Sequence, residues 1–223
     1  MNEIKSSDWT AILQSVAQVM TDNADHLCEM DARMGDGDLG PDHEEGLLRP
    51  ARNLFGLEEA DMGKRLSKSG MKMSSVVPST MGTLMSSGIM AGGKALKGKP
   101  ELDAAGLAAY IAAFADGIQQ RGKCQRGNRT ILDALAAAAD KASALVSAHP
   151  ESSLQDVINA AVEGAGEGVE ATKSMTPVFG KAAVFAAKAI GTPDQGAVAG
   201  RYMLIGMQNY ILPVACASPF YLK

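Results

Sequence analysis

The chain has 223 residues, of which 46% are hydrophobic, and it carries a formal net charge of -4 at pH 7. This length and apolar content suffice for one domain with a buried core, whereas the acidic balance argues against a nucleic-acid partner, because nucleic-acid-binding domains normally present a basic face to phosphates. No stretch approaches the roughly 18 consecutive apolar residues that cross a bilayer, so no membrane partner is expected.

Helices dominate the elements that the sequence predicts, because Ala, Leu, Met and Gly are abundant while aromatic residues make up only 4%. The first helix is expected to begin after Ser6 and Ser7, either of which can cap it, and to present one apolar face at a period of 3.6 residues. That face consists of Trp9, Ile12, Leu13, Val16, Val19 and Met20.

Further helices are expected between segments rich in glycine, proline or polar residues. They are predicted over residues 43–55, 61–76, 80–97, 103–121, 130–147, 153–173, 180–190 and 196–211. Because short connections join them, they are expected to pack antiparallel in one all-α bundle or closed ring, as a single domain over residues 1–223.

Three cysteines, Cys28, Cys124 and Cys216, lie far apart and show no C-x-x-C spacing. They indicate neither a disulfide framework nor a zinc cluster, and the polar N-terminus MNEIKSSDWT lacks the apolar segment of a signal peptide. We therefore expect a cytoplasmic protein.

The segment after the first helix, MDARMGDGDLG, carries three aspartates and three glycines in eleven residues. Glycine permits the positive-φ turns that would let Asp31 converge with Asp36 and Asp38. Three carboxylates at one point repel each other unless a cation neutralises them, and their hard oxygen atoms suit Mg²⁺ or Ca²⁺.

An EF-hand calcium loop is disfavoured, because position 12 counted from Asp36 is Leu47 and position 6 counted from Asp31 is Asp36. Mg²⁺ commonly takes few protein carboxylates, and water and substrate phosphates complete its octahedron. The loop therefore indicates a site for a metal-bound nucleotide, and a surface turn rich in Asp and Gly is the alternative explanation.

With this loop the sequence resembles the nucleotide-binding subunit, or C-terminal domain, of dihydroxyacetone kinases. The family has an aspartate followed by a G-D-x-D-x-G segment, as in the stretch from Asp31 to Gly40. Four further segments follow in the family's order, over nearly the whole chain: SGMKMSSVVPSTMGTL, RGKCQRGNRTILDAL, EATKSM and GTPDQGA.

The resemblance implies a closed barrel of about eight amphipathic antiparallel helices, with ADP or ATP and two Mg²⁺ ions held in loops at one end. It implies that Asp31, Asp36 and Asp38 are the metal ligands. The residues it assigns to the nucleotide are Leu39, Gly40, Pro41, Asp42, Thr80, Met81, Gly122, Ile131, Lys181, Pro193, Asp194 and Gln195.

The resemblance also implies partners. In this family a separate subunit or domain holds the ketose, so a chain of this kind is expected to work with a ketose-binding kinase subunit. The phosphate is expected to come from ATP, or from a phosphocarrier subunit of the phosphoenolpyruvate phosphotransferase system that rephosphorylates bound ADP.

The physical roles of several of these residues stay open from sequence alone. Free backbone N–H groups at a helix start near Thr80 could bind phosphate oxygens, or the position could be an ordinary N-cap. Gly122 marks a helix end, and the next helix could be capped through Asn128 or Thr130. Asp133 could face the nucleotide or cap that helix.

The sequence departs from the family pattern around the loop. The usual His is Leu39, an Asn is Asp42, and the usual GDKT segment has Asn128 as its second residue. A Gly-rich GGASG loop becomes PSTMG, which keeps Gly82, and an Arg becomes Lys181. The metal ligands are kept while their surroundings change, which suggests a divergent paralogue acting on another small ketose, such as a tetrulose.

Three hypotheses follow. The preferred one is a kinase subunit that transfers phosphate from a Mg²⁺-nucleotide to a hydroxyketone held by a partner, with no catalytic base of its own. The alternative is a noncatalytic nucleotide-sensing partner of a regulator or kinase subunit. A helical metal-binding scaffold that binds no nucleotide is the third.

Overall fold

The computed structural model describes residues 3–34, 59–77, 79–179 and 181–212. Six of the predicted site residues, Asp36, Asp38, Leu39, Gly40, Pro41 and Asp42, lie outside this part of the chain, as does the helix predicted over residues 43–55. The remaining predicted site residues lie inside it, except that the side chain of Lys181 is not described.

The described part of the chain is almost wholly helical, as predicted. Its α-helices are α1 (Trp9–Asp22), α2 (Ala24–Met34), α4 (Met62–Val76), α5 (Thr80–Ala95), α6 (Ala104–Gly122), α7 (Ile131–Ala148), α8 (Leu154–Thr172), α9 (Ala186–Ala189) and α10 (Gln195–Ile211). Two 3-10 helices, η1 (Ser6–Asp8) and η2 (Lys181–Phe185), complete the helical elements. The short strands β1 (Ile4–Lys5) and β2 (Glu101–Leu102) pair antiparallel, with Ile4 opposite Leu102.

Short polar side chains set the helix starts. The N-cap side chain accepts a hydrogen bond from the first turn in α5 (Ser79 from Gly82 N, 3.0 Å), α6 (Asp103 from Gly106 N, 2.7 Å) and α10 (Asp194 from Ala197 N, 2.8 Å). Such caps satisfy backbone N–H groups that have no partner inside the helix. The main helices therefore begin within about one or two residues of the positions predicted from sequence.

Helix α2 and the segment over residues 180–190 differ from the prediction, and the strands β1 and β2 were not predicted. Asp31 was expected in a loop, but this residue lies in α2, which continues the chain beyond α1. The buried Leu27 and the partly buried Met30 hold α2 against the core, and this apolar face was obscured by the charged residues around it. The helix predicted over 180–190 is wrong as one element, because the segment forms η2 followed by the single turn of α9.

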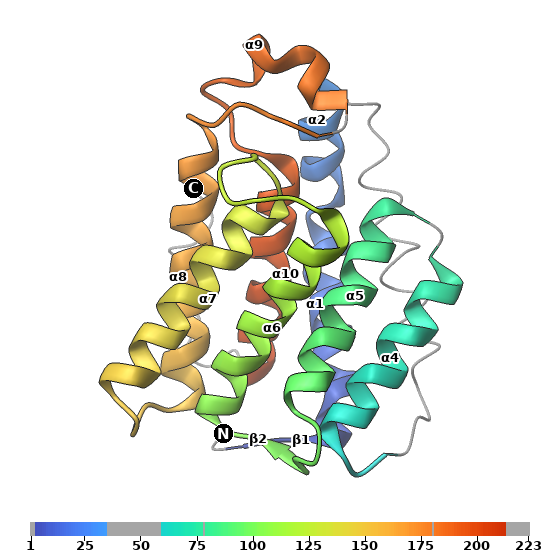
Figure 1. The fold of residues 1–223 in the computed structure, drawn as a ribbon, viewed down its shortest axis with the longest axis vertical. Coiled ribbons are helices and arrows are strands. Elements are labelled where there is room, and N and C mark those ends of the chain that lie inside the picture. The colour runs from blue at the N-terminus through green and yellow to red at the C-terminus, as the bar shows by residue number, and fades with distance from the viewer. Residues whose placement is uncertain (1–2, 35–58, 78, 180, 213–223) are drawn as a thin grey trace.

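Neighbouring helices run antiparallel along the chain from α4 to α8, and α10 packs against both α8 and α1 (Figure 1). Arg65 Nη2 of α4 donates to Thr10 Oγ1 of α1 at 3.1 Å, so the two ends of this row also meet. Closure into a complete barrel stays a prediction, because residues 35–58 lie outside the described structure.

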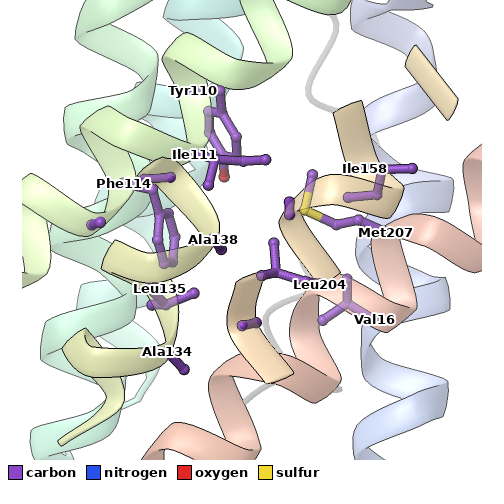
Figure 2. Close-up of a cluster of buried hydrophobic side chains, with 14 of the residues drawn as sticks. Val16, Tyr110, Ile111, Phe114, Ala134, Leu135, Ala138, Ile158, Leu204 and Met207 are labelled. Atoms are coloured by element: carbon purple, nitrogen blue, oxygen red, sulfur yellow. The ribbon is translucent and has the colours of Figure 1, made fainter. Parts of the chain in front are cut away.

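The core lies between the helices. Figure 2 shows Val16 of α1, Phe114 of α6, Leu135 of α7 and Met207 of α10 pointing toward a shared apolar interior. A cavity of about 50 Å³ remains among these side chains. None of the described helices is both long and apolar enough to cross a bilayer.

Candidate functional site

The predicted site residues that the structure describes gather at one end of the molecule. In Figure 1 the strands β1 and β2 lie at the opposite end, whereas α2, α9 and the first turns of α5, α7 and α10 lie at this one. Because helix N-termini carry partial positive charge, this end is suited to binding an anion, although side-chain caps already occupy some of the first-turn N–H groups.

The side chains of Asp31 and Gln195 meet at this end, although they are 164 residues apart in sequence. Asp31 lies in the last turn of α2 and is 6% exposed, and Gln195 is the first residue of α10. Gln195 Nε2 donates to Asp31 Oδ1 at 3.2 Å. The structure therefore joins one predicted metal ligand to one predicted nucleotide contact.

The position of Asp31 favours a nearby cation. The C-terminal end of a helix carries partial negative charge, to which the buried carboxylate adds its own. A hard oxygen donor in such a place suits Mg²⁺ in its ligand chemistry. Among the described residues, no three His, Cys, Asp or Glu side chains group closely enough to hold a metal ion, and the other two predicted ligands lie outside them.

The N-termini of α7 and α10 lie against each other beside this pair. A Cβ atom added to Gly196 would lie 3.3 Å from the backbone nitrogen of Ile131, and one added to Gly200 would lie 3.0 Å from Ile131 Cγ1. Ile131 is thus in contact with the first turns of α10, next to the segment from Pro193 to Gln195. Two helix N-termini pointing to one place reinforce the attraction for an anion.

Hydrogen bonds in the loop before α7 and in its first turn show the roles of Asn128, Thr130 and Asp133, which the sequence left open. Asp133 accepts hydrogen bonds from the backbone nitrogens of Thr130 (2.8 Å) and Gly127 (2.5 Å), and Thr130 Oγ1 accepts from Leu132 N (3.2 Å). Asn128 Oδ1 accepts from Gln125 N at 2.8 Å. Thr130 and Asp133 therefore cap α7, and Asn128 stabilises the loop.

Asp194 also serves as a cap. Its side chain is 5% exposed and accepts from Ala197 N at 2.8 Å, and its own backbone nitrogen donates to Thr172 Oγ1 at 2.9 Å. Burial raises the pKa of this carboxyl to about 6, against the opposing effects of the Ala197 hydrogen bond and the Arg129 charge. The carboxyl of Asp194 is therefore engaged in capping α10.

The first turn of α5 and the last turn of α6 lie side by side. Thr80 is exposed and Met81 is partly buried against the core. A Cβ atom added to Gly122 would lie 3.2 Å from Leu84 Cδ2, so this glycine allows α6 to approach α5 closely. The positive φ that ends α6 belongs to Lys123, at 51°.

Arg129 also lies at this end, although it was not among the residues predicted for the site. It is 2% exposed and has a positive φ of 58°. It donates hydrogen bonds to the segment that leads into α10. An arginine between Asn128 and Thr130 in a polar loop gave no local signal of burial, because burial there depends on segments more than 40 residues away.

The sequence of this chain is similar to those of several known proteins. Residues 33–209 match the DAK2 domain family. Triokinase/FMN cyclase of Rattus norvegicus is 32% identical over 201 residues, which cover 88% of this chain and 33% of that protein. L-erythrulose 1-kinase of Mycolicibacterium smegmatis is 30% identical over 203 residues, which cover 90% of this chain and 35% of that one. The chain thus spans about a third of the length of these relatives.

Another relative has nearly the same length as this chain. The ADP-binding subunit DhaL of the PEP-dependent dihydroxyacetone kinase 1 of Listeria innocua is 28% identical over 202 residues, covering 90% of this chain and 94% of the subunit. Among solved structures, the dihydroxyacetone kinase from C. freundii in complex with AMP-PNP and Mg²⁺ matches 90% of this chain and 33% of its own, with a TM-score of 0.66 and 23% identity. This structural likeness supports the all-helical fold.

Proposed function

Because the chain belongs to the DAK2 domain family, we propose that it is the nucleotide-binding part of a kinase for small ketoses. It binds ADP or ATP with Mg²⁺ at the end where α2, α7 and α10 meet. The acceptor is a hydroxyketone such as dihydroxyacetone or a tetrulose, held by a partner subunit. Residues 1–223 form one domain for this purpose.

The observation that carries the proposal is the junction of Asp31, Gln195 and the N-termini of α7 and α10. A buried carboxylate at a helix C-terminus attracts a cation, and two helix N-termini beside it attract an anion. A Mg²⁺-nucleotide offers both charges at once, since its cation is bound to its phosphate oxygens. The hydrogen bond between Gln195 and Asp31 keeps the two halves of such a site together.

Each residue then has a defined role. Asp31, Asp36 and Asp38 would hold two Mg²⁺ ions, which when bound would neutralise charge on the transferring phosphoryl group. The partial positive charge at the starts of α7 and α10 attracts the phosphates, with Ile131 and the segment from Pro193 to Gln195 lining the nucleotide. Leu39 to Asp42, Thr80, Met81, Gly122 and Lys181 complete its surroundings.

Phosphoryl transfer needs little covalent chemistry from a protein, because positioning and charge stabilisation lower most of the barrier. No catalytic base is required in this chain when the partner subunit presents the acceptor hydroxyl. The name of the Listeria relative, a PEP-dependent kinase subunit, supports a phosphocarrier subunit of the phosphoenolpyruvate phosphotransferase system as phosphate donor. ATP is the other candidate donor, and a cytoplasmic location fits either.

Calorimetry with Mg²⁺-ADP tests the site directly. The native chain should bind with a saturable heat, and Asp31→Asn should weaken binding at least tenfold because it removes the charge that attracts the cation. Asp25→Asn is the matched control, since Asp25 is exposed in the first turn of the same helix and should leave affinity within twofold. The proposal fails if the native chain binds no nucleotide, or if Asp31→Asn binds as well as the native chain.

A coupled assay then tests the kinase activity. The chain is mixed with a purified ketose-binding subunit and either dihydroxyacetone or erythrulose, with ATP or with phosphoenolpyruvate and its phosphocarrier proteins as donor. Phosphorylated ketose should form only when both subunits are present. Turnover by this chain alone would contradict the proposed division of labour.

A noncatalytic nucleotide sensor is the second candidate. It is favoured by Leu39, which stands where the family usually has a histidine. Asn128, which stands where the family usually has an aspartate, does not favour the sensor, because its side chain accepts a hydrogen bond from Gln125 N within the same loop. Nucleotide binding without turnover in the coupled assay, with any of the partners, would select the sensor.

A further inference from the structure

Arg129 lies at the centre of the segments that lead into α10. Its Nε donates to Thr172 O at 3.3 Å, and its Nη2 donates to Ala189 O (3.2 Å), Thr192 O (3.0 Å) and Pro193 O (3.4 Å). Thr172 is the last residue of α8 and Ala189 the last residue of α9. One guanidinium thus joins the ends of two helices to the turn that precedes a third.

These contacts suit an arginine, because its planar, charged guanidinium carries several N–H donors that point in fixed directions. Carbonyl groups at helix ends lack partners inside the helix and carry partial negative charge. A buried cation surrounded by such carbonyls is therefore stabilised without a direct ion pair.

The arrangement is costly, which argues that it does more than stabilise the fold. A non-glycine residue at a φ of 58° is strained by about 1 kcal/mol. The Nη1 atom is buried and has no hydrogen-bond partner among the described residues. A well-packed apolar side chain is often as stabilising as a buried charge, so what distinguishes Arg129 is the set of hydrogen bonds that it makes to this turn.

The turn before α10 is held from a second side. Thr172 Oγ1 accepts from the backbone nitrogen of Asp194 at 2.9 Å, and Gly191 N donates to Lys173 O at 2.8 Å. Arg129 and Thr172 together restrain the residues immediately before Gln195. The direction in which α10 begins, and with it the reach of Gln195 to Asp31, depends on these contacts.

We propose that Arg129 is a positioning residue of the nucleotide site, which fixes the turn from Ala189 to Pro193 so that Gln195 and the first N–H groups of α10 face the phosphates and Asp31. This inference rests on the proposed function. Arg129 touches no ligand in this role, because its guanidinium is buried behind the turn.

The test uses Arg129→Met, which keeps a Cβ atom at the same φ and a stem of similar length but removes every donor. Calorimetry should show Mg²⁺-ADP affinity lowered at least tenfold. Hydrogen exchange of residues 189–196 in the nucleotide-free chain should become faster, while exchange in the buried parts of α6 and α7 stays unchanged. Arg129→Lys should restore part of the affinity, since an ammonium group can reach some of the same carbonyls.

Arg126→Met is the matched control. Arg126 lies three residues earlier in the same loop and pairs on the surface with Asp140, so its loss should leave affinity within twofold. Native-like affinity in Arg129→Met, or unchanged exchange in residues 189–196, would overturn the inference. A role in overall stability alone would instead raise exchange throughout the molecule.

Thr172→Val keeps the inference testable if Arg129→Met does not fold. It removes the acceptor for Asp194 N while leaving the arginine in place, and should also weaken nucleotide binding with faster exchange in residues 189–196. Unchanged affinity in Thr172→Val would overturn the inference in that case. If the native chain binds no nucleotide, the proposed function falls, and the exchange of residues 189–196 alone decides whether Arg129 fixes this turn.

Discussion

Asp194 is a buried carboxyl whose proton is held more tightly in the folded chain than in the unfolded one. Burial raises its pKa from 3.8 to about 6. Its favourable contribution is therefore complete below about pH 4 and is lost as the pH rises through 6, by an amount on the order of 3 kcal/mol. Asp194→Asn keeps a capping oxygen for Ala197 N but cannot ionise.

Urea unfolding of the native chain and of Asp194→Asn between pH 4 and 7.5 checks this expectation. The native chain should lose stability relative to the variant as the pH rises. Asp61→Asn supplies the control, because a hydrogen bond from the backbone of Lys64 lowers the pKa of Asp61. A lowered carboxyl pKa changes stability mainly below about pH 4, so the difference between the native chain and this variant should be nearly constant from pH 4 to 7.5. A flat difference for Asp194→Asn would contradict the burial of its charge.

At the scale of single residues, the sequence predicted the local roles of side chains, such as capping a helix, better than it predicted which distant side chains lie in contact. Local rules offered Asn128 or Thr130 as the cap of α7, and in the structure the cap is Thr130. The contact between Asp31 and Gln195 could not be derived from local patterns, because it joins residues 164 positions apart. Gln195 entered the predicted site only through the resemblance to dihydroxyacetone kinases, whereas Asp31 was also a candidate cation ligand from the aspartate-rich segment itself.

At the scale of elements, close packing of α8 on α7 depends on particular glycines. A Cβ atom added to Gly168 would lie 2.5 Å from Asp133 O and 2.7 Å from Ala134 Cα, both in the backbone of α7. Gly168→Ala should therefore lower the free energy of unfolding by about 2–3 kcal/mol, since α7 cannot move aside cheaply. Circular dichroism during urea unfolding measures the change.

Gly166→Ala is the matched control on the same helix. Its added Cβ atom would meet only the Arg201 side chain, at 3.5 Å, which is ordinary contact. Alanine favours a helix over glycine by roughly 0.5–1 kcal/mol, so this variant should be slightly more stable than the native chain. Equal effects of the two substitutions would contradict the close approach of α7 and α8 at Gly168.

Element boundaries were predictable where a capping residue precedes an apolar period, as at Ser153 before α8. The short helix α2 was missed because Asp31 was assigned to the same loop as Asp36 and Asp38. The strands β1 and β2 were also missed, since two residues are too few to show an alternating pattern. Composition and period therefore predict long helices well and short elements poorly.

At the scale of the whole molecule, binding and folding are linked. A ligand that binds only the folded chain at a concentration 100 times its Kd stabilises it by about 2.7 kcal/mol. For a domain of this size, that corresponds to a rise in Tm of roughly 5–10 °C. Mg²⁺-ADP should therefore shift the Tm of the native chain by this amount, in one cooperative transition if residues 1–223 form one domain.

Differential scanning calorimetry with and without Mg²⁺ tests whether the stabilisation of the chain by ADP depends on the cation. ADP in the presence of EDTA should give a much smaller shift, because the carboxylate of Asp31 would then face the phosphates without a cation between them. Asp31→Asn, with affinity lowered tenfold at the same ADP concentration, should retain only about 1.4 kcal/mol and hence about half of the native shift. A shift of equal size with EDTA, or two separate transitions, would contradict the metal-bridged site or the single domain respectively.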